Sequence, residues 1–258
     1  MPDFLDRLVE DAKVRIRAGY YDTRESAAHK PVSLKSAMKS ATNNAIIAEI
    51  KPVSPALGPL RLILDPVDAA TKLAKGGAIA LSVLTEPDNF GGSLSNLLQI
   101  RRHVSIPLLM KDIIVDKSQI KAGARGGADC VLLIESAFSR QPANSLSKII
   151  DIAHNYQLEV LLEVHNKDEL DRALKSRADI IGVNNRNLET LETDLGTTAK
   201  VMSAVHDRAG KLIISESGFA KAEDIRQIKS MAVDGFLIGS SIMLSQDLES
   251  KVREFVLA

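Results

Sequence analysis

Cysteine and aromatic side chains are scarce in this sequence. Cys130 is its only cysteine among 258 residues, and it has no tryptophan, three tyrosines and six phenylalanines. One cysteine cannot form an internal disulfide, and Cys130 lies in an apolar run, so we expect a buried thiol and a reducing, cytoplasmic location. Because single-stranded nucleic acid binds to successive aromatic side chains, an aromatic content of 3% argues against that partner.

Net charge, long apolar runs and cofactor motifs are also absent. The 33 Lys and Arg residues balance 33 Asp and Glu residues, so no overall field attracts nucleic acid or an anionic membrane. No apolar run approaches the roughly 18 residues that span a bilayer, and the charged amino terminus lacks the apolar centre of a signal peptide. The sequence contains no GxxxxGK[ST], no GxGxxG after a strand and no HExxH. We therefore expect no metal, no nucleotide cofactor, no nucleic acid and no membrane.

The five histidines share no spacing typical of metal ligands. They fall mostly on predicted helices or helix ends, which favours solvated or capping roles. His165, close after Glu163, is the only histidine near the polar site described below.

Short aliphatic runs alternate with longer amphipathic segments, as strands alternate with helices in α/β proteins. The runs are 46–51, 78–84, 107–111, 129–134, 158–163, 179–184, 212–216 and 235–238. Asp65, Ser93, Asp116 and Asn166 stand where helix caps are expected. Eight strands, each followed by a helix at intervals of roughly 20 to 32 residues, are typical of a (β/α)8 TIM barrel.

The length allows either one large barrel or two small domains. Because no linker or low-complexity segment divides the chain, we predict one domain, with a helical extension over 1–45 and the barrel over 46–258. Phe4, Leu8, Ala12 and Ile16 recur at every fourth residue, which predicts a helix that packs on one end of the barrel.

Ionisable and amide side chains stand at the ends of the predicted strands, where the active sites of such barrels collect. They are Glu49 and Lys51 after the first run, Lys111 after the third, Glu163 after the fifth, Asn184 and Arg186 after the sixth, and Glu216 after the seventh. Three acids and three bases are costly to bury singly, so we expect one convergent site. The alternative is a set of ion pairs that merely plugs the barrel mouth.

The loops after the seventh and eighth strands suggest a phosphate site. Ser217 and Gly218 follow one strand, Gly239 and Ser240 follow the other, and each loop leads into a helix. Glycine lets the backbone approach an anion, and these two loops often hold phosphate in TIM barrels. Tight-turn glycines with serine caps are the alternative interpretation.

With these residues in place, the sequence resembles the indole-3-glycerol-phosphate synthases, which close the indole ring in tryptophan biosynthesis. The resemblance runs from about residue 46 to the carboxyl terminus, with one matching segment per strand. The segments are IIAEIKPVSP (46–55), LSVLTEPDNFGGS (81–93), IPLLMKDIIV (106–115), ADCVLLI (128–134), LLEVH (161–165), IGVNNRNLETLETD (181–194), ISESG (214–218) and GFLIGSSIM (235–243).

The resemblance implies a small phosphorylated substrate, a carboxyphenylamino deoxyribulose 5-phosphate, that loses carbon dioxide and water without a cofactor. Lys111 would protonate the carbonyl oxygen and Glu163 would serve the dehydration, roles that need pKa values moved towards neutrality. Lys51 would bind or protonate the substrate, and Glu49 would hold both lysines in place. The implied binding residues are Asn184, Arg186 and Glu216 for hydroxyls and the carboxylate, Ser54, Ser217, Gly218, Gly239 and Ser240 for the phosphate, and Leu84, Phe90 and Leu132 for the aryl ring.

Departures from the family pattern at four positions affect binding. The first loop of the family usually reads KxxSPS followed by a basic residue and glycine, with basic residues after the lysine. Here Val53, Ala56 and Leu57 leave that loop without these charges. Ile113 stands where an aromatic residue is common, so stacking on the substrate ring from that position is lost.

Two other functions remain open on the residues alone. Lys111 could form a Schiff base with a ketose phosphate, as in an aldolase, if its pKa were depressed. A non-catalytic barrel that binds phosphorylated metabolites, or that serves as a partner subunit, would lack an acid or a base, and none is missing here. We expect a monomer or a weak homo-oligomer.

Overall fold

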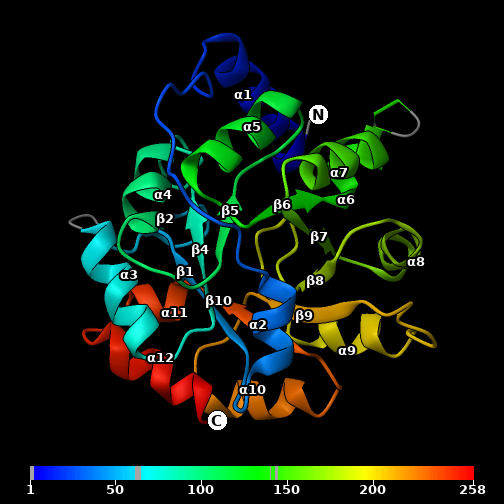
Figure 1. Cartoon of the computed structure of the whole chain (residues 1–258). Helices are drawn as coiled ribbons and strands as arrows, with labels where there is room; N and C mark the ends of the chain where they lie inside the picture. Colours follow the sequence, from blue (N-terminus) through cyan, green and yellow to red (C-terminus); the bar gives the residue numbers. More distant parts are fainter. Residues whose placement is uncertain (1–2, 62–64, 140, 143–144) are drawn as a thin grey trace.

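Parallel strands close into a barrel with helices around it (Figure 1). The computed structural model describes residues 3–61, 65–139, 141–142 and 145–258. The strands of the barrel are β1 (Ile46–Ile50), β4 (Ala80–Leu84), β5 (Leu108–Lys111), β6 (Cys130–Ile134), β7 (Glu159–Val164), β8 (Ile180–Asn184), β9 (Leu212–Glu216) and β10 (Gly235–Ile238). Each pairs in parallel with its sequence neighbours, and β10 pairs with β1 to close the ring. The predicted (β/α)8 fold is confirmed.

Helices follow the strands of the barrel. They are α3 (Pro66–Lys75), α4 (Leu94–Arg101), α5 (Lys117–Gly126), α6 (Glu135–Ser139), α7 (Ser145–Asn155), α8 (Lys167–Lys175), α9 (Gly196–Met202), α10 (Ala222–Lys229), α11 (Ser240–Met243) and α12 (Leu248–Val256). Asp65, Ser93, Asp116 and Asn166 each accept a backbone N–H of the following helix, which satisfies donors that lack a partner inside the helix. A short hairpin, β2 (Val53–Ser54) with β3 (Gly58–Pro59), forms in the loop after β1 and was not predicted.

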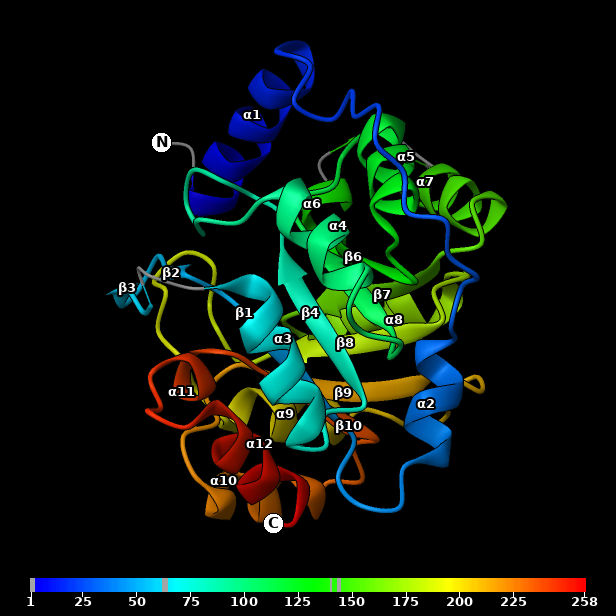
Figure 2. The same cartoon turned by 60° about the vertical axis from the view of Figure 1, so that its left-hand side comes forward.

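The segment before the barrel contacts it in two places. Helix α1 (Phe4–Arg17) buries Leu8 and Ala12 of the predicted stripe together with Leu5, while Phe4 and Ile16 of the stripe are partly buried. A second helix, α2 (Leu34–Ser40), was not predicted. Its capping residue Ser33 donates to Glu159 at the start of β7, so α2 covers the amino-terminal end of the barrel. Figure 2 shows the connection between α1 and α2 passing α5, where the backbone N–H of Ala27 donates to the carbonyl oxygen of Arg125.

The interior is mainly aliphatic. Ile47, Leu81 and Leu109 on adjacent strands are fully buried, and burying each such side chain contributes about 1.5–3 kcal/mol. Cys130 is a buried free thiol. No helix in the described ranges is long and apolar enough to span a membrane. Because the strands are parallel, the polar residues at their carboxyl ends meet at one end of the barrel.

Candidate active site

Three carboxylates surround one lysine at the carboxyl ends of the strands. Lys111 Nζ, from β5, lies 3.5 Å from Glu49 Oε2 on β1, 3.8 Å from Glu163 Oε2 on β7 and 3.9 Å from Glu216 Oε2 on β9. The lysine side chain is 20% exposed and the three carboxylates are almost fully buried. Residues from four strands thus form one charged cluster.

Burial and charge move the pKa values of this cluster in different directions. Burial lowers the pKa of Lys111, but the three carboxylates outweigh it and raise that pKa above the usual lysine range. Burial raises the pKa of Glu163, but Lys111 and His165 outweigh it and lower that pKa to about 2. Burial and the charge of Glu163 raise the pKa of Glu216 to about 8. The expected shift towards neutrality is therefore wrong for Lys111 and Glu163, because opposite charges in a buried cluster stabilise both charged forms.

The other predicted polar residues flank this cluster. Lys51 Nζ lies 2.8 Å from Glu49 Oε1, so Glu49 contacts both lysines. The side chain of Asn184 contacts Glu163 and helps to lower its pKa. Arg186 donates through Nη1 to the carbonyl oxygen of Leu191 and pairs with no carboxylate in the described part of the chain. Its guanidinium stands apart from the cluster, beside the same cavity.

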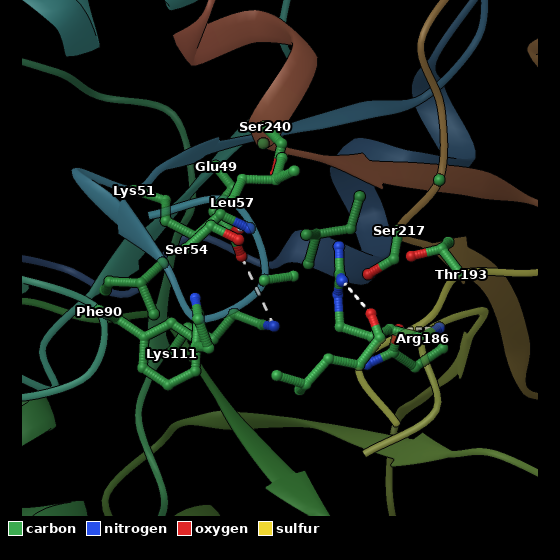
Figure 3. Close-up of a pocket in the computed structure, with 18 of the residues that line it drawn as sticks. Glu49, Lys51, Ser54, Leu57, Phe90, Lys111, Arg186, Thr193, Ser217 and Ser240 are labelled. Atoms are coloured by element: carbon green, nitrogen blue, oxygen red, sulfur yellow. Dashed lines mark hydrogen bonds and ion pairs between the residues drawn. The ribbon is translucent and has the colours of Figure 1, made fainter. Parts of the chain in front are cut away.

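A cavity of about 460 Å³ opens above the cluster. Of the fifteen predicted site residues, all except Glu216 line this cavity, and Glu216 lies beneath it against Lys111. Figure 3 shows Lys111 reaching towards the centre, with Phe90 on one side and Ser217 on the other. A volume of this size is typical of sites for small ligands.

The cavity has an apolar part and a part rich in serine and glycine. Leu84, Phe90 and Leu132 line it as predicted. Phe4 and Leu8 of α1 also line it and were not assigned to the site, although the helix stripe already indicated that they pack on the barrel. The helical extension is thus part of the cavity wall.

The serine and glycine residues come from three loops. Ser54 follows β1, Ser217 and Gly218 follow β9, and Gly239 and Ser240 begin α11 after β10. Ser217 has φ 67° and Gly218 has φ 92°, so this turn uses left-handed backbone at both positions. A side chain at the second position would be strained and would meet the neighbouring loop.

The departures from the family pattern also lie at this cavity. Ala56 and the exposed Leu57 line its mouth, where the family has serine and a basic residue. Ile113 is buried and lines the wall after Lys111. The loop after β1 thus presents apolar atoms where charge is usual.

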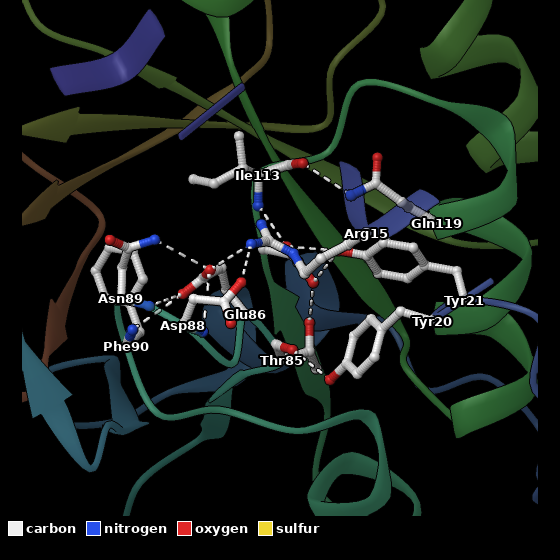
Figure 4. A network of polar contacts seen from close by, with 11 residues as sticks. Arg15, Tyr20, Tyr21, Thr85, Glu86, Asp88, Asn89, Phe90, Ile113 and Gln119 are labelled. Carbon is white, nitrogen blue, oxygen red and sulfur yellow. Dashed lines mark hydrogen bonds and ion pairs between the residues drawn. The ribbon is translucent and has the colours of Figure 1, made fainter. Parts of the chain in front are cut away.

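A buried polar network, which sequence reasoning missed, shapes the loop that carries Phe90 (Figure 4). The carboxylate of Glu86 accepts backbone N–H groups of Asp88 (3.2 Å), Asn89 (2.8 Å) and Phe90 (2.9 Å). Arg15 of α1 places Nη1 2.8 Å from Glu86 Oε1 and 2.6 Å from Asp88 Oδ2. The sequence signal for this turn is the Pro-Asp-Asn segment that follows the glutamate.

The same network extends to Asp112, the residue after Lys111. Tyr21 donates its hydroxyl to Asp112 Oδ1 (3.1 Å), and Thr85 Oγ1 donates to Asp112 Oδ2 (2.6 Å). Burial raises the pKa of Asp112 to about 6, against the lowering effect of these hydrogen bonds. Tyr20 donates to the carbonyl oxygen of Thr85 and accepts the backbone N–H of Leu94, so it joins both ends of the loop after β4.

His29 and His165 are partly buried beside carboxylates, so the expectation of solvated or capping histidines is wrong for them. His29 Nε2 lies 2.9 Å from Asp129 Oδ1. His165 Nε2 lies 3.2 Å from Glu163 Oε1, and its Nδ1 lies 3.2 Å from Glu169 Oε2. In the residues that the structure describes, no group of three or more His, Cys, Asp and Glu side chains is arranged to hold a metal ion.

Comparison with known proteins identifies the family. The family profile described as indole-3-glycerol phosphate synthase matches residues 5–255. The indole-3-glycerol phosphate synthase of Methanocaldococcus jannaschii is 43% identical over 232 residues, covering 88% of this chain and 84% of that protein. The same enzyme of Acetivibrio thermocellus is 36% identical over 244 residues, covering 95% and 92%.

A likeness to a solved structure supports the fold alone. Thiamine phosphate pyrophosphorylase from Pyrococcus furiosus superposes with a TM-score of 0.60 at 17% identity, covering 86% of this chain and 96% of that chain. The sequence matches, by contrast, span the barrel and most of the segment before it. The chain belongs to the indole-3-glycerol phosphate synthase family.

Proposed function

We propose that this protein is a carboxy-lyase that converts 1-(2-carboxyphenylamino)-1-deoxyribulose 5-phosphate into indole-3-glycerol phosphate with loss of carbon dioxide and water. The observation that carries the proposal is Lys111, a charged lysine held between three buried carboxylates at the floor of the cavity. Such a lysine is a proton donor in a site that excludes much of the solvent. Family membership supplies the substrate and the reaction.

In the first step, Lys111 donates its proton to the carbonyl oxygen of the substrate. The ring carbon that bears the carboxylate attacks the carbonyl carbon, and the carbonyl oxygen becomes a hydroxyl. The carbon–carboxylate bond then breaks, and its electron pair returns to the ring as carbon dioxide leaves. The raised pKa keeps Lys111 protonated before the reaction, and its proton passes to the oxyanion because that oxyanion is the stronger base as it forms.

In the second step, the hydroxyl leaves as water. Glu163, ionised because its pKa is lowered to about 2, accepts the proton that the new ring must lose. Lys51 donates a proton to the departing hydroxyl, and Glu49 positions both lysines through its two oxygens. Glu216, whose pKa is raised to about 8, exchanges its own proton with this cluster near neutral pH.

The proposed binding mode uses both parts of the cavity. The aryl ring packs against Leu84, Phe90 and Leu132, and the phosphate binds the serine and glycine loops. The proposed phosphate contacts are Ser54, Ser217, Gly218, Gly239 and Ser240. Arg186 binds the aryl carboxylate, since its guanidinium faces the cavity without an acidic partner among the described residues, and Asn184 orients a substrate hydroxyl.

A turnover assay tests this function. The purified protein, without added metal, should form an indole product that is followed by its absorbance and fluorescence. Lys111→Ala should lower kcat by at least about 100-fold, the scale of a general acid, whereas Ser240→Ala should mainly raise KM. Full turnover in Lys111→Ala would refute the role of this lysine.

The aldolase alternative has its own test. A Schiff base needs a lysine with a depressed pKa, and the surrounding carboxylates raise the pKa of Lys111 instead. Borohydride reduction in the presence of a ketose phosphate should therefore leave Lys111 unmodified. A covalent adduct on this lysine would favour the aldolase.

We also propose a reducing, cytoplasmic compartment, and a monomer or weak homo-oligomer. The lone buried thiol of Cys130 supports the compartment, because a protein with no possible internal disulfide gains nothing from oxidising conditions. Sedimentation of the purified protein tests the oligomeric state.

A further inference from the structure

His165 lies between two buried carboxylates that belong to different parts of the barrel. Its Nε2 is 3.2 Å from Oε1 of Glu163, at the end of β7, and its Nδ1 is 3.2 Å from Oε2 of Glu169, in α8. Glu163 turns its other oxygen towards Lys111, at 3.8 Å. Lys111, Glu163, His165 and Glu169 thus follow one another in contact from the cavity outward to α8.

Glu169 is fixed in its place by further hydrogen bonds. Its Oε2 accepts the backbone N–H of His165 (2.8 Å), and its Oε1 accepts a proton from Asn166 Nδ2 (2.7 Å). The backbone N–H of Glu169 donates in turn to Asn166 Oδ1 (3.0 Å). Because the carboxylate cannot swing away without losing these bonds, it also fixes the orientation of the imidazole ring.

The ring of His165 does not reach the substrate cavity. It is 14% exposed and lines a second cavity of about 360 Å³, together with Glu169, Ser136, Asn184 and Arg186. Asn184 therefore stands between the two cavities, since it lines both. His165 can act on the reaction only through Glu163.

Charged groups from several elements of the barrel surround Glu163 and His165. Groups that face the cluster come from four other strands and loops: Lys111 on β5, Glu216 on β9, Glu49 on β1 with its partner Lys51, and the neutral Asn184 on β8. On the far side, α8 contributes Glu169, while Glu135 of α6 is already paired with Arg172. Glu216, whose pKa is raised to about 8, is mostly protonated near neutral pH, so the two lysines offset Glu49 and Glu163, and a positive ring of His165 would offset Glu169.

We propose that His165 is a positioning residue of the ring-closing reaction: as an imidazolium held by Glu169, it keeps Glu163 ionised and orients its second oxygen towards Lys111. This inference rests on the catalytic role proposed for Glu163. Burial lowers the pKa of His165, but the two carboxylates outweigh it and raise that pKa to about 10. An opposite charge at this distance shifts the pKa of a carboxyl by about 1 to 3 units.

The charge of the ring is measured first, on the unaltered protein. Nitrogen-15 NMR of labelled histidine at pH 7.5 should report protons on both ring nitrogens of His165. Glu169→Gln should lower the pKa of the ring by at least about one unit. A neutral ring in the unaltered protein at pH 7.5 would overturn the proposal, and this measurement needs no variant to fold.

The effect on the reaction is measured through the pH profile of kcat. In His165→Asn the acid limb should move to higher pH by about 1 to 3 units, because Glu163 loses its neighbouring positive charge. His154→Asn is the matched control, since His154 Nε2 lies 2.9 Å from Asp179 on the outer side of the barrel. Its profile should match that of the unaltered protein.

Two results separate this inference from the proposed function. If Glu163→Gln is inactive and the acid limb of His165→Asn is unchanged, the positioning role is wrong and the catalytic role of Glu163 stands. If Glu163→Gln keeps full turnover, both are wrong.

Discussion

Replacing Arg15 tests whether the helical extension stabilises the active-site loop after β4. The Arg15 side chain is 8% exposed, and the carboxylate of Glu86 that it neutralises is 0% exposed. Arg15→Met keeps most of the apolar stem but removes the charge. The carboxylate of Glu86 then remains in the interior without a cation.

The expected cost follows from that burial. Removing one partner of a buried ion pair costs about 3–5 kcal/mol. Glu86 keeps three backbone N–H donors, so we expect the lower end, about 3 kcal/mol. For a chain of this size, each kcal/mol lowers Tm by about 2–4 °C, so Tm should fall by about 6–12 °C.

The assay is denaturant unfolding at pH 7, with an exposed ion pair as control. Lys72 lies 2.6 Å from Asp68, but the two side chains are 49% and 54% exposed, so Lys72→Met should cost less than about 0.5 kcal/mol. Adding Glu86→Gln to Arg15→Met should recover only part of the loss, because the amide needs no counter-charge but its NH2 group cannot accept the backbone N–H that one carboxylate oxygen of Glu86 accepts. KM should rise in Arg15→Met, since the turn that holds Phe90 loosens. Equal losses in Arg15→Met and Lys72→Met would refute the reasoning.

Three further predictions concern pH, packing and metal. Folding raises the pKa of His165 from 6.5 to about 10 and that of Glu216 from 4.5 to about 8. The folded protein therefore binds these two protons more tightly than the unfolded chain does, and the free energy of unfolding should fall as pH rises from 4.5 towards 10. Measurements at pH 6.5, 8 and 10 should show this decline, and a flat profile would contradict it. Gly182→Ala places a Cβ 1.9 Å from Glu216 Oε1 and must displace that carboxylate. We expect kcat/KM to fall by about 100-fold, and an unchanged kcat/KM would show that Glu216 has no positioning role. EDTA should leave turnover unchanged, because the proposed proton transfers use side chains alone; a loss restored by a divalent cation would contradict the mechanism.

Much of the fold and part of the site could be predicted from the sequence. Parallel barrel strands are buried on both faces, so runs such as 130–134 appear as continuous apolar stretches. The chain direction is the same in every strand, and this brings Glu49, Lys111 and Glu163 to one end once the barrel is recognised. A polar residue directly after an aliphatic run is therefore a local signal with a predictable position.

Other features depend on contacts between distant parts of the chain. Helix α2 is only seven residues long, and it forms where its capping residue Ser33 bonds to the amino-terminal end of the barrel. Arg15 resembles any charged residue of an amphipathic helix until α1 places it against Glu86. His165 resembles a residue at a helix start until two carboxylates enclose it.

The order of strands and helices, the helix caps and the chemical types at the strand ends can be read from the amino-acid sequence, because these depend on local pattern and on the direction of the chain. Which charges are buried together, and so the direction of each pKa shift, depends on how the folded chain brings distant residues into contact. Lys111 shows the difference, since its position was predictable from a strand end, whereas its raised pKa required the distances to Glu49, Glu163 and Glu216. Electrostatic energies depend on separation and on exposure to solvent, and neither is fixed before the chain folds.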